Sequence, residues 1–154
     1  MRRLKALRGV SLVEALVALT ISAMLLVAGL PAFTDYLRNT RLREAGHALL
    51  ADAQLAQSEA VKRNASVRLE TTGSLVRISE TTSSPALDRQ QNLPESIVAT
   101  SASITFDSRG RPAADAAIDL QLSGAACSAS LRCPGLRLDA GGGIRLCGDL
   151  SSCN

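Results

Sequence analysis

Aromatic residues and histidine are nearly absent from this chain of 154 residues. It has no tryptophan, and its aromatic side chains are Phe33, Tyr36 and Phe106. Proteins that bind single-stranded nucleic acid stack the bases on aromatic rings, so this composition argues against such a platform. The single histidine, His47, lies on a polar stretch with no metal-binding or catalytic partner nearby in the sequence. We therefore interpret it as an ordinary helix residue.

A strong net charge is also lacking once the first nine residues are set aside. The chain has 17 Lys and Arg against 14 Asp and Glu, but four of the basic residues precede Val10. The remainder is nearly neutral, which argues against nucleic-acid binding through overall charge. The sequence also has no nucleophile–base pair, phosphate-binding glycine loop or zinc-like cysteine spacing. We therefore expect no enzyme, no cofactor and no metal.

One long apolar run is present near the N-terminus. From Val10 to Leu30 every residue is apolar, small or hydroxylated except Glu14. An α-helix crosses the apolar core of a bilayer in about 20 residues, so we predict a transmembrane helix over about 10–32. The basic residues before the run predict that the N-terminus stays in the cytoplasm and the C-terminal body faces outward. They are Arg2, Arg3, Lys5 and Arg8.

Glu14 is the anomaly in this run, because a carboxylate inside a membrane is costly and usually functional. If the chain were cut after Gly9, the new amino group of Val10 would lie one helical turn from Glu14. That amine could pair with Glu14 of the same chain or of a neighbour. The alternative is a carboxylate that simply reaches the lipid headgroups.

The basic leader, Gly9, an apolar residue, Ser11-Leu12-Val13-Glu14 and the apolar helix together resemble the class III signal of type IV pilins and type II secretion pseudopilins. The resemblance implies that a prepilin peptidase removes residues 1–9 and N-methylates Val10, although Phe is the common residue there. It implies that Glu14 guides the subunit into a filament of other pilins. It also implies a single-pass protein of the bacterial inner membrane with a periplasmic head, which then joins a pilus or pseudopilus.

An ordinary secretory signal is the alternative interpretation of the same run. Small residues at Val27-Ala28-Gly29 would allow cleavage before Leu30, leaving a secreted periplasmic domain. Two features argue against it: Glu14 would lie inside the apolar region, and that region is longer than the 7–15 residues usual for a signal.

A helical pattern continues to residue 64. Small and apolar residues recur at spacings of three and four and define one face, which we expect to lie close to a sheet. Asn64 follows Lys62 and Arg63 and is the predicted C-terminal stop, so residues 10–64 form one long helix. The residues of the apolar face are Leu42, Ala45, Leu49, Ala53, Ala56 and Ala60.

Beyond Asn64 the periodicity changes from 3.6 to 2, as in β-strands. Residues 81–95 are polar with two prolines and are predicted to form a long loop. One helix followed by several strands predicts an α+β fold, in which the long helix packs on a β-sheet head over residues 65–154, as in pilins. The predicted strands are 67–71, 75–79, 97–100, 103–107, 117–122, 136–139 and 144–147.

Three segments resemble the GspH/FimT group of minor pilins: 56–64 (AQSEAVKRN), 104–111 (ITFDSRGR) and the glycine-rich hairpin that enters 144–147 (IRLC). The resemblance implies a minor pilin of the complex that initiates type IV pilus assembly. It equally implies a GspH-like pseudopilin of a type II secretion system.

Some FimT-like pilins bind double-stranded DNA without sequence specificity during natural transformation, through arginines around a Gly-Arg-x-Arg motif. Here Gly142 to Arg145 match that motif, with Gly143 in place of its first arginine. The candidate DNA-binding residues are Arg132, Arg137 and Arg145, the last two facing each other across the predicted hairpin. The alternative is that they are solvated strand arginines offset by nearby acids.

The four cysteines lie within the last 28 residues, and an even number in an outward-facing body predicts disulfides. Local pairing, Cys127–Cys133 with Cys147–Cys153, is favoured. The alternative joins Cys133 to Cys147 across the hairpin and Cys127 to Cys153.

Overall fold

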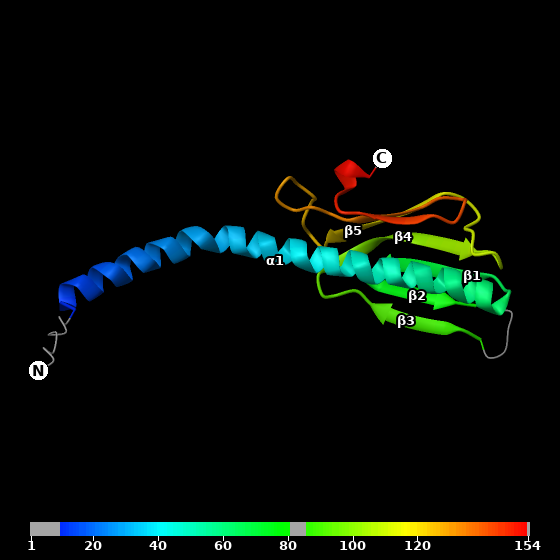
Figure 1. The fold of residues 1–154 in the computed structure, drawn as a ribbon, viewed down its shortest axis with the longest axis horizontal. Helices are drawn as coiled ribbons and strands as arrows, with labels where there is room; N and C mark the ends of the chain where they lie inside the picture. The colour runs from blue at the N-terminus through cyan, green and yellow to red at the C-terminus, as the bar shows by residue number, and fades with distance from the viewer. Residues whose placement is uncertain (1–9, 81–85, 154) are drawn as a thin grey trace, which may run out of the picture. The chain divides into compact units, whose positions relative to one another are not determined.

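The computed structural model describes residues 10–80 and 86–153 (Figure 1). The predicted leader, including Gly9, lies outside the described residues. The chain divides into two compact units, Met1–Tyr36 and Leu37–Asn154. A single helix, α1 (Leu12–Arg63), contributes its first part to the first unit and the remainder to the second.

In the second unit, α1 buries the predicted apolar face against the sheet. The six residues of that face are each at most 1% exposed, which confirms the pattern of three and four. Four of the six are alanines, so the backbone of the helix lies close to the strands. A Cβ added to Gly46 would come within 3.2 Å of the Leu146 side chain and 3.3 Å of Pro134, which shows equally close packing on the C-terminal hairpin.

The end of α1 is fixed by Asn64, as the sequence predicts. Asn64 adopts a left-handed conformation with φ of 50°, which asparagine tolerates better than most residues. Its backbone N–H donates to the Val61 carbonyl at 3.2 Å, and that of Ala65 donates to the Ala60 carbonyl at 3.2 Å. This pair of bonds is a Schellman motif, which satisfies carbonyls that the last helical turn leaves open.

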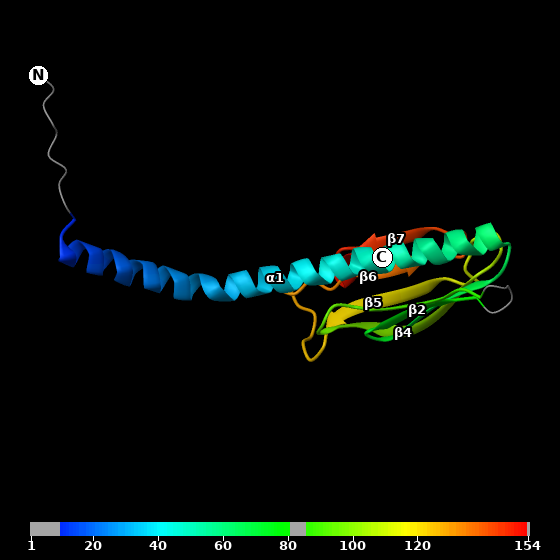
Figure 2. The ribbon, with the colours of Figure 1, turned by 90° about the horizontal axis from the view of Figure 1, so that it is seen from below.

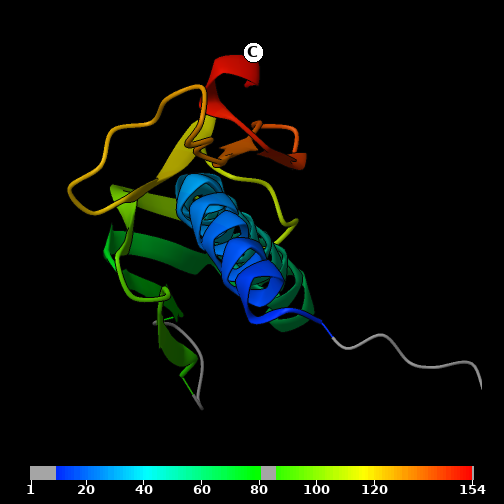
Figure 3. The ribbon, with the colours of Figure 1, turned by 90° about the vertical axis from the view of Figure 1, so that its left-hand side faces the viewer.

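Seven antiparallel strands form one sheet in the order β3-β2-β1-β4-β5-β6-β7. The C-terminal part of α1 covers one face of this sheet (Figure 2), and the strands curve around it (Figure 3). A short 3₁₀-helix, η1 (Leu150–Ser152), follows the last strand. The strands are β1 (Val67–Gly73), β2 (Leu75–Ser79), β3 (Asp88–Asn92), β4 (Ile97–Phe106), β5 (Ala116–Leu122), β6 (Gly135–Leu138) and β7 (Ile144–Cys147).

The prediction of two strands at 97–100 and 103–107 is wrong, because β4 is continuous across both. Thr71 of β1 is opposite Ala102 and Gly73 is opposite Ala99, so β4 has one extra residue in this interval. That β-bulge shifts the alternation of buried and exposed residues, which makes one strand look like two in the sequence. The Thr71 hydroxyl donates to the Thr100 carbonyl at 2.7 Å and satisfies the acceptor that the bulge frees.

The prediction of a loop over 81–95 is also wrong in part, because β3 lies within it. Residues 81–85 are outside the described residues. The five residues of β3 are Asp, Arg, Gln, Gln and Asn, so no apolar alternation marks them as a strand. They pair with β2 at the edge of the sheet, and Asp88 accepts hydrogen bonds from Arg77 at 2.9 and 3.0 Å. Pairing, rather than local preference, makes this segment a strand.

Candidate functional site

The first unit presents a long apolar surface on α1. Large apolar side chains from Val10 to Leu30 are between 52% and 75% exposed. An 18-residue window of α1 has a mean hydropathy of 2.2 and no buried part, so the helix is long and apolar enough to cross a membrane. Soluble proteins rarely expose an apolar surface of this kind, which is typical of helices that lie in lipid or pack against other apolar helices.

Two hydroxyl groups within this surface, those of Thr20 and Ser22, are satisfied by the helix itself. Thr20 Oγ1 donates to the Leu16 carbonyl at 2.6 Å, and Ser22 Oγ donates to the Ala18 carbonyl at 2.7 Å. Such bonds remove the cost of placing a hydroxyl in an apolar medium. Glu14, in the first turn of α1, is therefore the group whose placement there is most costly.

The N-terminal chemistry predicted around Glu14 is not tested by this structure. Val10 is described and is 73% exposed, but it lies ahead of the helix, which begins at Leu12. Cleavage after Gly9, methylation of Val10 and pairing of its amine with Glu14 all remain predictions.

Two disulfides close the loops at the C-terminal end of the second unit. They join Cys127 to Cys133, with Cα atoms 5.7 Å apart, and Cys147 to Cys153, with Cα atoms 5.4 Å apart. This is the local pairing that the sequence favours. The Leu150 N–H donates to the Cys133 carbonyl at 2.8 Å, which holds the two disulfide loops to each other.

Asn39 holds the first of these loops to α1, a role for which no local pattern is a signal. Its side-chain amide donates to the Ser130 carbonyl at 2.7 Å, and its Oδ1 accepts the Arg132 N–H at 2.8 Å. Both amide functions therefore bind the backbone of a loop about 90 positions later in the chain. In the sequence Asn39 is one polar residue among several on this helix, and its role becomes visible only when the loop is in place.

Gln57 is a second connecting residue, inside the segment that carries the GspH/FimT resemblance. Its Nε2 donates to the Gly110 carbonyl at 2.7 Å and to the Gly142 carbonyl at 2.8 Å. One amide thus holds the β4–β5 connection and the β6–β7 hairpin tip against α1. Both glycines have positive φ, 75° and 98°, which aims their carbonyls at the helix and disfavours other residues.

The β4–β5 connection is ordered by Asp107. Its Oδ1 accepts the backbone N–H groups of Arg109 and Arg111, each at 2.9 Å. These donors, the Arg111 N–H first, lower the pKa of the Asp107 carboxyl. The Arg111 guanidinium also lies 3.7 Å from the Asp107 carboxylate, so the acid and the base of this turn neutralise each other.

The three candidate DNA-binding arginines do not form one site. Arg137 lies directly opposite Arg145 in the β6–β7 register, as the sequence predicts, and both line one cleft. Arg132 lines a different cleft, beside α1.

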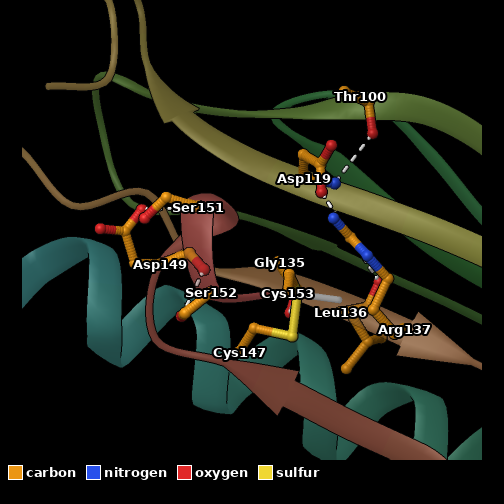
Figure 4. A network of polar contacts seen from close by, with 10 residues as sticks. All are labelled: Thr100, Asp119, Gly135, Leu136, Arg137, Cys147, Asp149, Ser151, Ser152 and Cys153. Carbon is orange, nitrogen blue, oxygen red and sulfur yellow. Dashed lines mark hydrogen bonds and ion pairs between the residues drawn. A yellow bond between two sulfur atoms is a disulfide. The ribbon is translucent and has the colours of Figure 1, made fainter.

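The two hairpin arginines also differ in how far their charge is neutralised. Arg137 Nη1 donates to Asp119 Oδ1 of β5 at 2.5 Å, and the two side chains point toward each other in Figure 4. Among residues 10–80 and 86–153, no carboxylate lies within 4 Å of the Arg145 guanidinium. The charge of Arg145 is therefore exposed to solvent without a neutralising carboxylate nearby in the described chain, whereas the charge of Arg137 is neutralised by Asp119.

His47 is exposed on α1 and lines the same cleft as Arg132. In the part of the chain that the structure describes, no group of three His, Cys, Asp or Glu residues is arranged to hold a metal ion.

Known proteins resemble this chain in both sequence and fold. The model of the family described as type II transport protein GspH matches residues 45–147. Two crystal forms of the type IV minor pilin FimU from Pseudomonas aeruginosa (strain PAO1) match at TM-scores of 0.58 and 0.54, both with 19% sequence identity. The matches cover 72% and 68% of this chain and 91% and 90% of the FimU chains. No curated protein sequence matches. The fold is thus the α+β pilin fold that the sequence predicts.

Proposed function

Because the chain belongs to the family of type II transport protein GspH, we propose that it is a minor pilin of the complex that initiates type IV pilus assembly. The observation that carries this proposal is the exposed apolar surface from Val10 to Leu30 with Glu14 as its one charged residue. Helices of sibling subunits supply apolar surroundings for such a surface once it leaves the bilayer. A pseudopilin of a type II secretion system is the alternative role for the same features.

The proposed mechanism begins with proteolysis. A prepilin peptidase removes residues 1–9 at the inner membrane and methylates the amino group of Val10. Glu14 then pairs with the N-terminal amine of a neighbouring subunit. Glu14 lies in the first turn of α1, and a charge within the apolar part of a membrane is costly, so an arrangement in which the two opposite charges meet is favoured over one in which they stay apart.

The N-terminus of the mature protein tests the first step. We expect mass spectrometry of the full chain, co-expressed with a prepilin peptidase, to identify a methylated Val10 as the first residue. A first residue at Leu30 would instead identify an ordinary secretory signal. A chain that keeps Gly9 in the presence of the active peptidase would contradict the proposed processing.

Substitution of the acid tests the second step. We expect Glu14→Gln to insert into the membrane and be cleaved normally but to be missing from sheared filaments, as judged by immunoblot. Ser22→Ala is the matched control on the same helix, because the Ser22 hydroxyl bonds only within the helix. Incorporation of Glu14→Gln at the parent level would refute a pairing role. Co-purification with minor pilins or with secretion pseudopilins then separates the two machines.

We also propose, as a second function, weak binding of double-stranded DNA by the β6–β7 hairpin. The specific observation in its favour is the exposed Arg145, without a carboxylate partner in the described chain and opposite Arg137. One or two phosphate contacts give weak binding that salt abolishes and that is independent of sequence.

A gel-shift assay of the full chain in detergent at low salt tests this function. We expect retardation that Arg145→Ala weakens more than Arg137→Ala does, because Arg137 is already bound to Asp119. Arg109→Ala, an arginine on a different turn, is the control. The absence of any shift with the parent protein excludes this function.

A further inference from the structure

A basic cleft lies between the second-unit part of α1 and the two disulfide loops. Its volume is about 320 Å³, within the range of small-ligand sites. Arg43 and His47 line it from the helix, one turn apart, and Arg132 lines it from the first disulfide loop. Pro134 and Leu146 supply its apolar wall.

The walls of this cleft are held in place by the contacts already described. Asn39, which also lines the cleft, fixes the backbone of Arg132 through Oδ1. The disulfides fix both ends of the loops, and the Leu150 N–H joins one loop to the other. A site that is ordered before its ligand arrives loses less entropy on binding.

The charges of the cleft are only partly balanced. Within residues 10–80 and 86–153, neither Arg43 nor Arg132 has a carboxylate within salt-bridge distance. Asp149 is the one acid in the lining, and its Oδ1 already accepts the Ser151 N–H at 3.2 Å as the cap of η1. Two guanidinium groups and one carboxylate leave a net charge of +1 when His47 is neutral. The cleft therefore complements one monoanionic group.

We propose that this cleft binds a carboxylate carried by a peptide segment of a partner subunit. The planar fork of a guanidinium matches the two oxygens of a carboxylate, and such charge-assisted bonds are about twice as strong as neutral ones. The wall of Pro134 and Leu146 accommodates the aliphatic part of the same segment. Asp149 disfavours a doubly charged phosphate. The binding of a carboxylate follows from the lining of the cleft, and the identification of its carrier as a partner subunit rests on the proposed assembly function.

Two sources can supply this carboxylate, the C-terminus of a chain or an acidic side chain within one. The test is calorimetric titration of the full chain in detergent with two peptides. The first is acetyl-Gly-Gly-Ala-Ala-Leu with a free C-terminus, and the second is acetyl-Ala-Ala-Glu-Ala-Ala-amide. Their neutral controls are the amidated first peptide and the second peptide with Gln in place of Glu. We expect saturable binding of at least one acid peptide, at least tenfold tighter than its neutral control, and the tighter acid peptide identifies the source.

Matched arginine variants locate the binding. We expect Arg43→Gln to weaken binding at least tenfold, and Arg132→Gln to do the same. Arg41→Gln is the control, because Arg41 is exposed on the same helix outside the cleft. Thermal unfolding of each variant verifies that the fold is retained.

Three results would overturn the proposal: no saturable binding of either acid peptide, equal affinity for acid and neutral peptides, or equal weakening by Arg41→Gln and Arg43→Gln. Glu14→Gln separates this proposal from the assembly proposal. It is expected to block entry into filaments while leaving peptide binding unchanged, so either proposal can fail without the other.

Discussion

Gln57 is predicted to stabilise the head more than any other exposed or half-buried residue of its helix turn. Its single amide nitrogen donates to two carbonyls, at Gly110 and Gly142, in connections that are far apart in the chain. We expect Gln57→Ala to lose both bonds and to leave both acceptors without a protein partner. At about 0.5–1.5 kcal/mol for each bond, the free energy of unfolding should fall by about 1–3 kcal/mol.

Gln57→Glu provides a sharper version of the same test, because it conserves shape and replaces the donor by an acceptor. At neutral pH the new carboxylate faces two carbonyl oxygens and should destabilise the head more than Gln57→Ala does. This environment raises the pKa of the new carboxyl above its unfolded value. The folded state then favours the protonated form, which can donate one hydrogen bond. The stability of the variant, relative to the parent, should therefore be greatest at acid pH and fall as the pH rises through the raised pKa.

Thermal unfolding of the full chain in detergent between about pH 4 and 7 measures both effects. For a domain of this size, roughly 4 °C of Tm accompanies each kcal/mol, so Gln57→Ala should lower Tm by roughly 4–12 °C. Ser58→Ala is the neighbouring control, because the Ser58 hydroxyl bonds only the Leu55 carbonyl within the helix. A Gln57→Ala variant as stable as Ser58→Ala, or a Gln57→Glu penalty that does not change with pH, would refute the reasoning.

Three further outcomes are expected from the same unfolding assay. Asp52 is only 4% exposed, and this burial raises the pKa of its carboxyl above the ordinary value of 3.8. The contribution of Asp52 to the free energy of unfolding should therefore decrease as the pH rises above about 4. The stability of Asp52→Asn relative to the parent should accordingly rise with pH and be greatest at neutral pH; parallel pH profiles of the two proteins would contradict this. Gly110→Ala should lower the free energy of unfolding by about 1–2 kcal/mol, because the φ of 75° at this position is strained for alanine. An unchanged Tm would show that this turn can relax. The double variant Cys147→Ser, Cys153→Ser should lower the free energy of unfolding by about 2 kcal/mol, which is the chain-entropy value for a loop closed over a separation of six residues. A double variant as stable as the parent would show that η1 is held without the disulfide.

The elements that the sequence predicts correctly are those with a local cause. The face from Leu42 to Ala60 follows from a spacing that brings residues onto one side of a helix, whatever lies opposite. Asn64 ends the helix because its own backbone adopts the left-handed conformation. The apolar run with Glu14 can likewise be identified from the sequence alone, because its length and hydropathy are properties of consecutive residues.

The elements that it misses depend on partners distant in the chain. The polar strand β3 exists because β2 offers it an edge, and the bulge in β4 appears only when β1 is aligned beside it. Asn39 and Gln57 are ordinary helix residues until loops from the other half of the chain reach them.

The sequence by itself therefore determined the helix, its buried face, the α+β class and the apolar segment with its single acid, because each arises from neighbours a few residues apart. Only the tertiary structure decided which arginines are free. Arg137 and Arg145 look equivalent in the chain, but the strand beside β6 brings Asp119 to the first and leaves the second exposed. Charge in a folded protein depends on the nearest opposite charge in space, and strand order, rather than local sequence, sets that neighbour.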